Sequence, residues 1–169
     1  MRENVIKEKL QKIFYECDKH IVRIESASKK MSFFMPLIED KYINLTEDEI
    51  AHIDQFLFRF SKLQDAMGQK LFRTTLLYLN EDIEGKPFID ILNIMEKLNL
   101  LKSTYIWREL RDDRNKLAHN YEDEPEEMSA TINILFEKKE LLIEIYLHIK
   151  SYLEDSFKSV GSNQKGMPQ

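Results

Sequence analysis

Near the middle of the chain, an arginine, a histidine and a tyrosine are spaced in a way that could support chemistry on phosphodiesters. Arg114, His119 and Tyr121 lie in the run RNKLAHNY, with the pattern R-x4-H-x-Y. Arginine carries a permanent planar cation that binds phosphate oxygens, and histidine is the side chain best suited to proton transfer near pH 7. Tyrosine adds a hydroxyl group that can be modified. The run therefore indicates phosphodiester chemistry, although R-x4-H alone would occur by chance in about one such chain in six.

The charge around this run is unevenly distributed. The formal net charge of the chain is -5, which by itself argues against a nucleic-acid partner. Within residues 102–116, however, five cations outnumber three carboxylates, and five acidic residues follow within residues 122–127. We interpret three of these cations as RNA-binding residues: Arg108, Arg111 and Lys116. The plainer alternative is an exposed helix face whose arginines pair with neighbouring carboxylates.

Composition limits the class of protein. The chain has 169 residues, of which 43% are hydrophobic, enough for one domain with a core. Its single cysteine, Cys17, excludes an internal disulfide, and the four scattered histidines show no ligand spacing for a metal. No apolar run approaches eighteen residues, so the sequence predicts neither a signal peptide nor a membrane span. We expect a cytoplasmic protein without a metal or another cofactor.

Apolar residues recur every three or four positions along most of the chain, which predicts an all-α fold. Few glycines and prolines interrupt this pattern. The second helix should begin at a capping box formed by Thr46 and Glu49. Short connections predict an antiparallel bundle over residues 1–155 and a flexible tail over residues 156–169. Five helices are expected, over about residues 3–29, 46–80, 88–101, 103–119 and 125–155.

The aromatic surface predicted around the second helix is broad. This breadth favours a homodimer interface about as strongly as it favours a wide core within one chain. It comes from six phenylalanines: Phe33, Phe34, Phe56, Phe58, Phe60 and Phe72.

Helix geometry constrains how Arg114 and His119 could act together. At about 100° per residue, Leu117 lies on the core-facing stripe and His119 points away from it. On a continuous α-helix, Arg114 and His119 would lie roughly 140° apart. A joint site therefore requires the helix to end or distort near Ala118, or both side chains to face a cleft. We expect the helix to stop near His119.

In this helical setting, the run from Arg114 to Tyr121 resembles the motif of HEPN domains, and more narrowly that of the HepT-like toxins. The resemblance covers the R-x4-H-x-Y pattern, the polar Asn115 that follows the arginine, and the helical order across residues 1–155. It implies a homodimeric, metal-independent endoribonuclease, the toxin of a toxin-antitoxin pair, in which two arginine-histidine pairs share one cleft. It also implies a nucleotidyltransferase antitoxin that adenylylates the motif tyrosine.

The resemblance assigns a role to each residue of the motif. It implies that Arg114 and His119 are catalytic, that Asn115 supports them and that Tyr121 accepts the adenylyl group. RNA cleavage without a metal needs a base, an acid and a cation for the developing charge, and the one histidine of the motif supplies only one proton-transfer group. A second copy of the chain would supply the second proton-transfer group.

Other interpretations of the motif stay open. The chain could be a non-catalytic HEPN module that binds a nucleotidyltransferase. Residue by residue, Arg114 could be an exposed, ion-paired arginine, His119 could favour a helix C-terminus through its charge, and Tyr121 could pack over the core.

Overall fold

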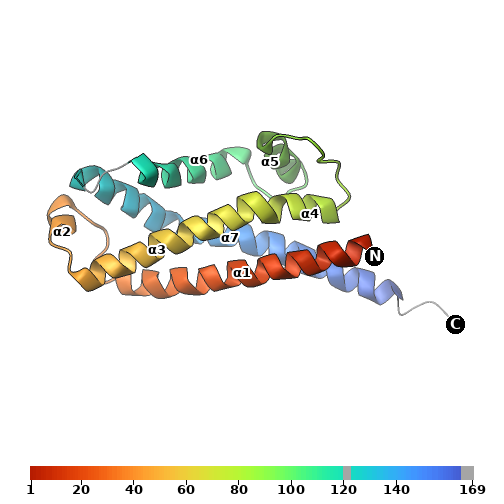
Figure 1. Cartoon of the computed structure of the whole chain (residues 1–169), viewed down its shortest axis with the longest axis horizontal. Coiled ribbons are helices and arrows are strands. Elements are labelled where there is room, and N and C mark those ends of the chain that lie inside the picture. The colour runs from red at the N-terminus through yellow and green to blue at the C-terminus, as the bar shows by residue number, and fades with distance from the viewer. Residues whose placement is uncertain (120–122, 165–169) are drawn as a thin grey trace.

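The computed structural model of the chain describes residues 1–119 and 123–164. Every regular element in these residues is helical, which confirms the all-α prediction. The long helices run side by side along the molecule, and α5 and α6 lie to one side of them (Figure 1). In chain order the elements are α1 (Arg2–Met31), α2 (Glu39–Ile43), α3 (Glu47–Ala66), the π-helical turn η1 (Met67–Leu71), α4 (Phe72–Tyr78), α5 (Phe88–Lys97), α6 (Thr104–Asn115), the 3-10 turn η2 (Lys116–His119) and α7 (Pro125–Gln164).

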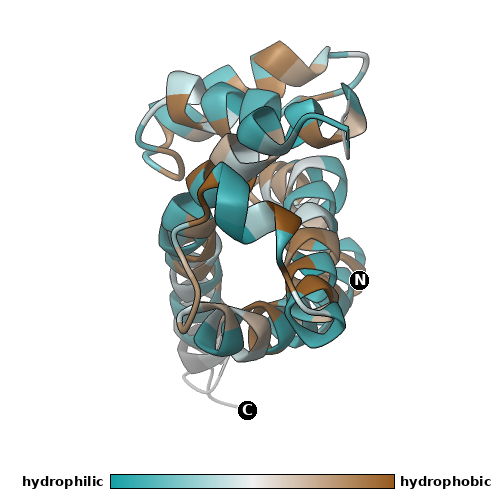
Figure 2. Cartoon of the chain, turned by 90° about the vertical axis from the view of Figure 1, so that its left-hand side faces the viewer, coloured by the Kyte–Doolittle hydropathy of each residue, from teal (hydrophilic) through white to brown (hydrophobic). Residues whose placement is uncertain are grey.

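The first helix packs through the stripe that its sequence predicts. Leu10, Cys17 and Ile24 are fully buried, and the outer face is mostly polar, with Val5, Tyr15 and Val22 exposed on it. The single hydroxyl proton of Tyr146, on α7, is shared between the carboxylate of Asp18 at 2.6 Å and a backbone carbonyl of α1 at 3.1 Å. Seen end-on, each long helix carries both hydrophilic and hydrophobic residues (Figure 2). Burial of the apolar stripes therefore holds α1 and α7 together, and one buried hydroxyl fixes their register.

The second long segment begins at the predicted capping box. The amide of Glu49 donates to the Thr46 hydroxyl at 3.2 Å, and the amide of Thr46 donates to the Glu49 carboxylate at 3.1 Å. The helix then runs through α3, η1 and α4 to Tyr78, close to the predicted end. The π-helical turn within it was not predicted from the spacing of the apolar residues.

This π-helical turn is the place where α6 approaches the long helix. A side-chain carbon added at Gly68 would lie 3.2 Å from Cζ2 of Trp107. Phe72, directly after the turn, packs against Trp107 at 4.6 Å and against Phe88 at 6.4 Å between ring centroids. A glycine and a widened turn thus leave room for the indole, and the three rings position α5 and α6 beside η1.

The broad aromatic surface proves to be mostly the core of one chain. Four of the six phenylalanines are buried, and only the other two are exposed, by 86% for Phe33 and 54% for Phe58. The number of phenylalanines is therefore not an argument for a dimer interface, and the homodimer stays a prediction. The buried four are Phe34, Phe56, Phe60 and Phe72.

The last helix is longer than expected. The sequence placed the end of the bundle at residue 155, whereas α7 continues to Gln164. The ring of Phe157 meets that of Tyr78 edge-on at 5.2 Å, and the ammonium group of Lys7 lies 4.9 Å from the Phe157 ring centroid. These contacts with α4 and α1 extend the packed part of α7. The boundary at residue 155 is thus too early for the helix, and residues 165–169 of the expected tail lie outside the described residues.

The single cysteine offers a test of core packing. Cys17 is fully buried, and this burial, with the charges of Glu16 and Asp18, raises the pKa of its thiol to about 12. Because the thiolate is the reactive form, we expect the native protein to resist alkylation by iodoacetamide, and the urea-unfolded protein to gain one adduct. Intact-mass spectrometry over time measures both. Equal rates of alkylation with and without urea would contradict the burial of this residue.

Candidate active site

The motif lies across the end of α6. The regular α-helix stops at Asn115, and η2 continues the chain to His119 with the tighter turn of a 3-10 helix. The distortion that the sequence required near Ala118 is therefore present. Leu117 is half-buried against the core and His119 is exposed, so the histidine points away from the core as predicted.

Arg114 turns from α6 toward the long helix. Its Nη1 atom donates to Oδ1 of Asp65, on α3, at 2.8 Å, and 24% of the arginine side chain is exposed. The partner is therefore 49 positions away in the chain and belongs to another helix. The interpretation of Arg114 as an exposed arginine paired along its own helix is wrong, because the guanidinium group bridges α6 to α3.

Two carboxylates of α6 pair instead with a lysine of α7. The Nζ atom of Lys138 lies 2.5 Å from Oδ2 of Asp113 and 3.3 Å from Oε1 of Glu109. Burial disfavours the charge of Lys138, but its hydrogen bonds with Asp113 and Glu109 and their negative charges outweigh that effect and raise its pKa. Lys116 also lies 3.7 Å from Asp113. The two ion pairs of Lys138 attach the C-terminal half of α6 to α7, whereas the pair of Lys116 with Asp113 lies within the segment formed by α6 and η2.

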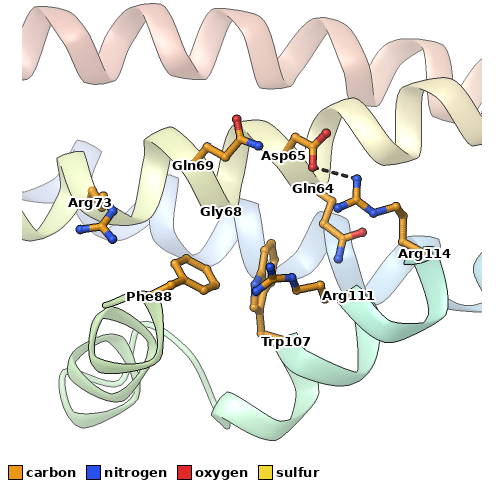
Figure 3. Close-up of a pocket in the computed structure, with 9 residues that line it drawn as sticks. All are labelled: Gln64, Asp65, Gly68, Gln69, Arg73, Phe88, Trp107, Arg111 and Arg114. Atoms are coloured by element: carbon orange, nitrogen blue, oxygen red, sulfur yellow. Dashed lines mark hydrogen bonds and ion pairs between the residues drawn. The ribbon is translucent and has the colours of Figure 1, made fainter. Parts of the chain in front are cut away.

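A hollow of about 350 Å³ is lined by residues of α3, η1, α4, α5 and α6, and we call it the arginine pocket (Figure 3). Its walls carry three guanidinium groups but one carboxylate, in a chain whose net charge is negative. The guanidinium carbon of Arg111 lies 5.6 Å from the Phe88 ring centroid, and Nη2 of Arg73 donates to the Lys86 carbonyl at 3.3 Å. The lining residues are Gln64, Asp65, Gly68, Gln69, Arg73, Phe88, Trp107, Arg111 and Arg114.

His119 lies at a different hollow. It lines that hollow with Lys116 and with residues of the first turns of α7, among them Glu127 and Thr131. Arg114 and His119 are thus separated by the change from α6 to η2 and line separate hollows. One chain does not bring the two predicted catalytic side chains together in a single cavity.

The other predicted site residues are also spread over the two hollows and the exposed surface of α6. Arg111 lines the arginine pocket beside Arg114, and Lys116 lies beside His119. Asn115 and Arg108 are exposed on α6. Tyr121, the predicted modification site, lies outside the described residues.

Sequence reasoning missed the part of the arginine pocket that comes from elements other than α6, which is six of its nine lining residues. Asp65 and Gln64 precede Arg114 by about fifty positions, and their spacing carries no motif. One signal was available. Gly68 interrupts an otherwise continuous helical pattern, and a glycine in such a position often marks a close approach of another element. Here that element is α6, through Trp107.

The chain matches no protein-family model, no curated protein and no solved structure. Membership of the HEPN domains therefore stays a prediction from the motif. In residues 1–119 and 123–164, no helix is long and apolar enough to cross a membrane. No group of three or more histidine, cysteine or acidic side chains in the same residues is placed to hold a metal ion.

Proposed function

We propose that the chain is a metal-independent endoribonuclease of the HEPN type, the toxin of a toxin-antitoxin pair, and that two copies together form its active site. The arrangement of the motif supports this proposal best. Arg114 lines a cationic pocket, and the end of α6 carries His119 onto the exposed surface. A phosphate-binding cation and an accessible imidazole are the groups that RNA cleavage requires.

In the proposed reaction, the ribose 2'-oxygen attacks the adjacent phosphorus. A base removes the proton of the 2'-hydroxyl, the bond from phosphorus to the 5'-oxygen breaks, and an acid protonates that leaving oxygen. The products carry a 2',3'-cyclic phosphate and a 5'-hydroxyl. His119 of one copy acts as the base and His119 of the other as the acid, while Arg114 stabilises the negative charge on the phosphoryl oxygens.

The need for a second copy follows from the separate positions of the two side chains. Within one chain, His119 and Arg114 line different hollows. A second copy that packs near the end of α6 can place its histidine beside the phosphate that the first copy's arginine holds. The exposed cations Arg108, Arg111 and Lys116 are proposed to attract the RNA backbone.

The proposed partner is a nucleotidyltransferase antitoxin in the cytoplasm. In adenylylation, the Tyr121 hydroxyl loses its proton, its oxygen forms a bond to the α-phosphorus of ATP, and the bond from that phosphorus to the departing pyrophosphate breaks. The adenylyl group adds negative charge and bulk two residues after His119. It would oppose the approach of an RNA phosphate to the imidazole.

Cleavage of labelled single-stranded RNA by the purified chain, in EDTA, tests the proposal. We expect fragments with 2',3'-cyclic phosphate ends, because the 2'-oxygen is the nucleophile and no metal takes part. The cyclic ends are identified by mass spectrometry. Intact RNA, or fragments with 3'-hydroxyl ends, would refute the proposed reaction.

A second candidate function is a non-catalytic module that binds a nucleotidyltransferase. The ion pair between Arg114 and Asp65 favours it, because a guanidinium group already paired with a carboxylate at 2.8 Å has less charge to offer a phosphate. Absence of cleavage, together with a stable complex between the chain and a nucleotidyltransferase, would establish this alternative.

A further inference from the structure

The arginine pocket contains a buried side chain whose polar atoms are unused. Gln64 is 2% exposed. In the part of the chain that the structure describes, neither its amide oxygen nor its amide nitrogen has a hydrogen-bond partner. Within the same described residues, the buried Nε atom of Arg114 is unpaired as well. Because an unpaired buried polar group is costly, such groups in a pocket point to a ligand that pairs with them.

The amide of Gln64 specifies the chemistry of that ligand. An amide presents an acceptor and a donor side by side, and the edges of nucleobases offer complementary pairs of polar atoms. Figure 3 shows Gln64 at the end of the pocket nearest Arg114, and a dashed line there joins the Asp65 carboxylate to the guanidinium group of Arg114. Arg114 itself is therefore occupied at Nη1 and still free at Nε.

The remaining walls fit the other parts of a nucleotide. Phe88 and Trp107 supply an apolar side, and the exposed Arg111 lies over the Phe88 ring. Bases pack on aromatic rings and on guanidinium planes alike. Arg73 lies at the opposite end of the pocket from Arg114 in Figure 3, where it can hold a phosphate. A volume of about 350 Å³ falls within the range of small-ligand sites.

We infer that the arginine pocket holds one base of the RNA next to the cleaved phosphate, and that Gln64 determines which base is accepted. The inference rests on the proposed function, since Arg114 lines this pocket and also serves the phosphate. Gln64 is a specificity residue in this scheme. The pairing of its amide with a base edge replaces the missing hydrogen bonds, whereas a base with the wrong edge leaves them unmade.

The decisive variant is Gln64→Met, which keeps the length of the side chain and removes both polar atoms. Cleavage of a random-sequence RNA pool, followed by sequencing of the new ends, measures the base next to the cut. For the wild type we expect one base to be enriched about tenfold or more. In Gln64→Met the enrichment should disappear. An unchanged enrichment in this variant would overturn the inference.

Gln55→Met is the matched control, because Gln55 also lies on α3 but does not line the pocket. Its base preference should equal that of the wild type. We also expect Gln64→Met to melt at the same temperature as the wild type or higher, since it removes an unpaired buried amide. If the methionine variant fails to fold, Gln64→Asn serves instead, because it keeps the amide but withdraws it from the ligand.

A second measurement separates failure of this inference from failure of the proposed function. Calorimetric titration with AMP, GMP, CMP and UMP requires no cleavage. We expect one mononucleotide to bind about tenfold more tightly than the weakest, and Gln64→Met to abolish that difference. If the wild type cuts no RNA but binds one mononucleotide more tightly than the others, the ribonuclease proposal is wrong and the inference of a base-binding pocket is supported. Equal or absent binding of all four would refute the base pocket, whatever the chain does to RNA.

Discussion

His119→Ala should lower the rate of RNA cleavage by a factor of about 10²–10⁴, the usual contribution of a general acid or base. Because His119 is exposed at the end of η2, its removal should leave the fold unchanged. Single-turnover rates on labelled RNA measure the first effect, and circular dichroism checks the second. His52→Ala, on α3 and far from the motif in the sequence, is the control and should cleave at the wild-type rate.

A loss of helicity in His119→Ala would instead indicate a structural role for the imidazole.

The same variant also tests the dimer. When wild type is mixed with excess His119→Ala under conditions that exchange subunits, each mixed dimer carries His119 in one copy only. If cleavage needs His119 from both copies, the rate of RNA cleavage should fall with the square of the fraction of wild-type chains. A linear fall would mean that each chain cuts RNA alone, which would contradict the shared site.

The features predicted correctly from the sequence are local ones. The capping box at Thr46 and Glu49 and the buried stripe of α1 depend on residues within a few positions of one another, so their spacing contains the information. The end of α6 near the motif is of the same kind. The separation of Arg114 and His119 was not predicted: the helix changes near the motif, and the two side chains still line different hollows.

The features that were missed depend on contacts between distant residues. Nothing in the neighbourhood of Arg114 indicates that its partner is Asp65, because that contact exists only once α6 lies against α3. The π-helical turn and the burial of Phe56 also follow from packing between helices. The six of nine lining residues that come from outside α6 could therefore not be predicted as part of a pocket, and the unpaired amide of Gln64 could be recognised only in the folded chain.

Asp65 adds a role that the motif does not contain. It is placed to orient the guanidinium group of Arg114 and does not line the hollow that His119 faces. In the proposed reaction, Asp65 is a positioning residue, which would act on the RNA through Arg114. In Asp65→Asn the amide oxygen can still accept the hydrogen bond, but the charge that holds the arginine in place is lost.

The second large effect is expected at Arg114. Arg114→Ala should lower the cleavage rate about 10²–10³-fold, the cost of removing one donor that stabilises the transition state. Arg114→Lys should recover little of this loss, because an ammonium group lacks the planar fork that can bind Asp65 and a phosphate together. Arg23→Ala, an exposed arginine of α1, is the control and should cleave normally.

Unfolding cannot account for a loss of that size. The side chain of Asp65 is 36% exposed, so breaking its ion pair with Arg114 should cost about 1 kcal/mol of stability or less. Urea unfolding of Arg114→Ala measures this cost directly. A small change in stability together with a large fall in the single-turnover rate would place the guanidinium group at the reacting phosphate. An Arg114→Lys variant with wild-type activity would instead show that the site needs only a positive charge, and the argument from the planar fork would fail.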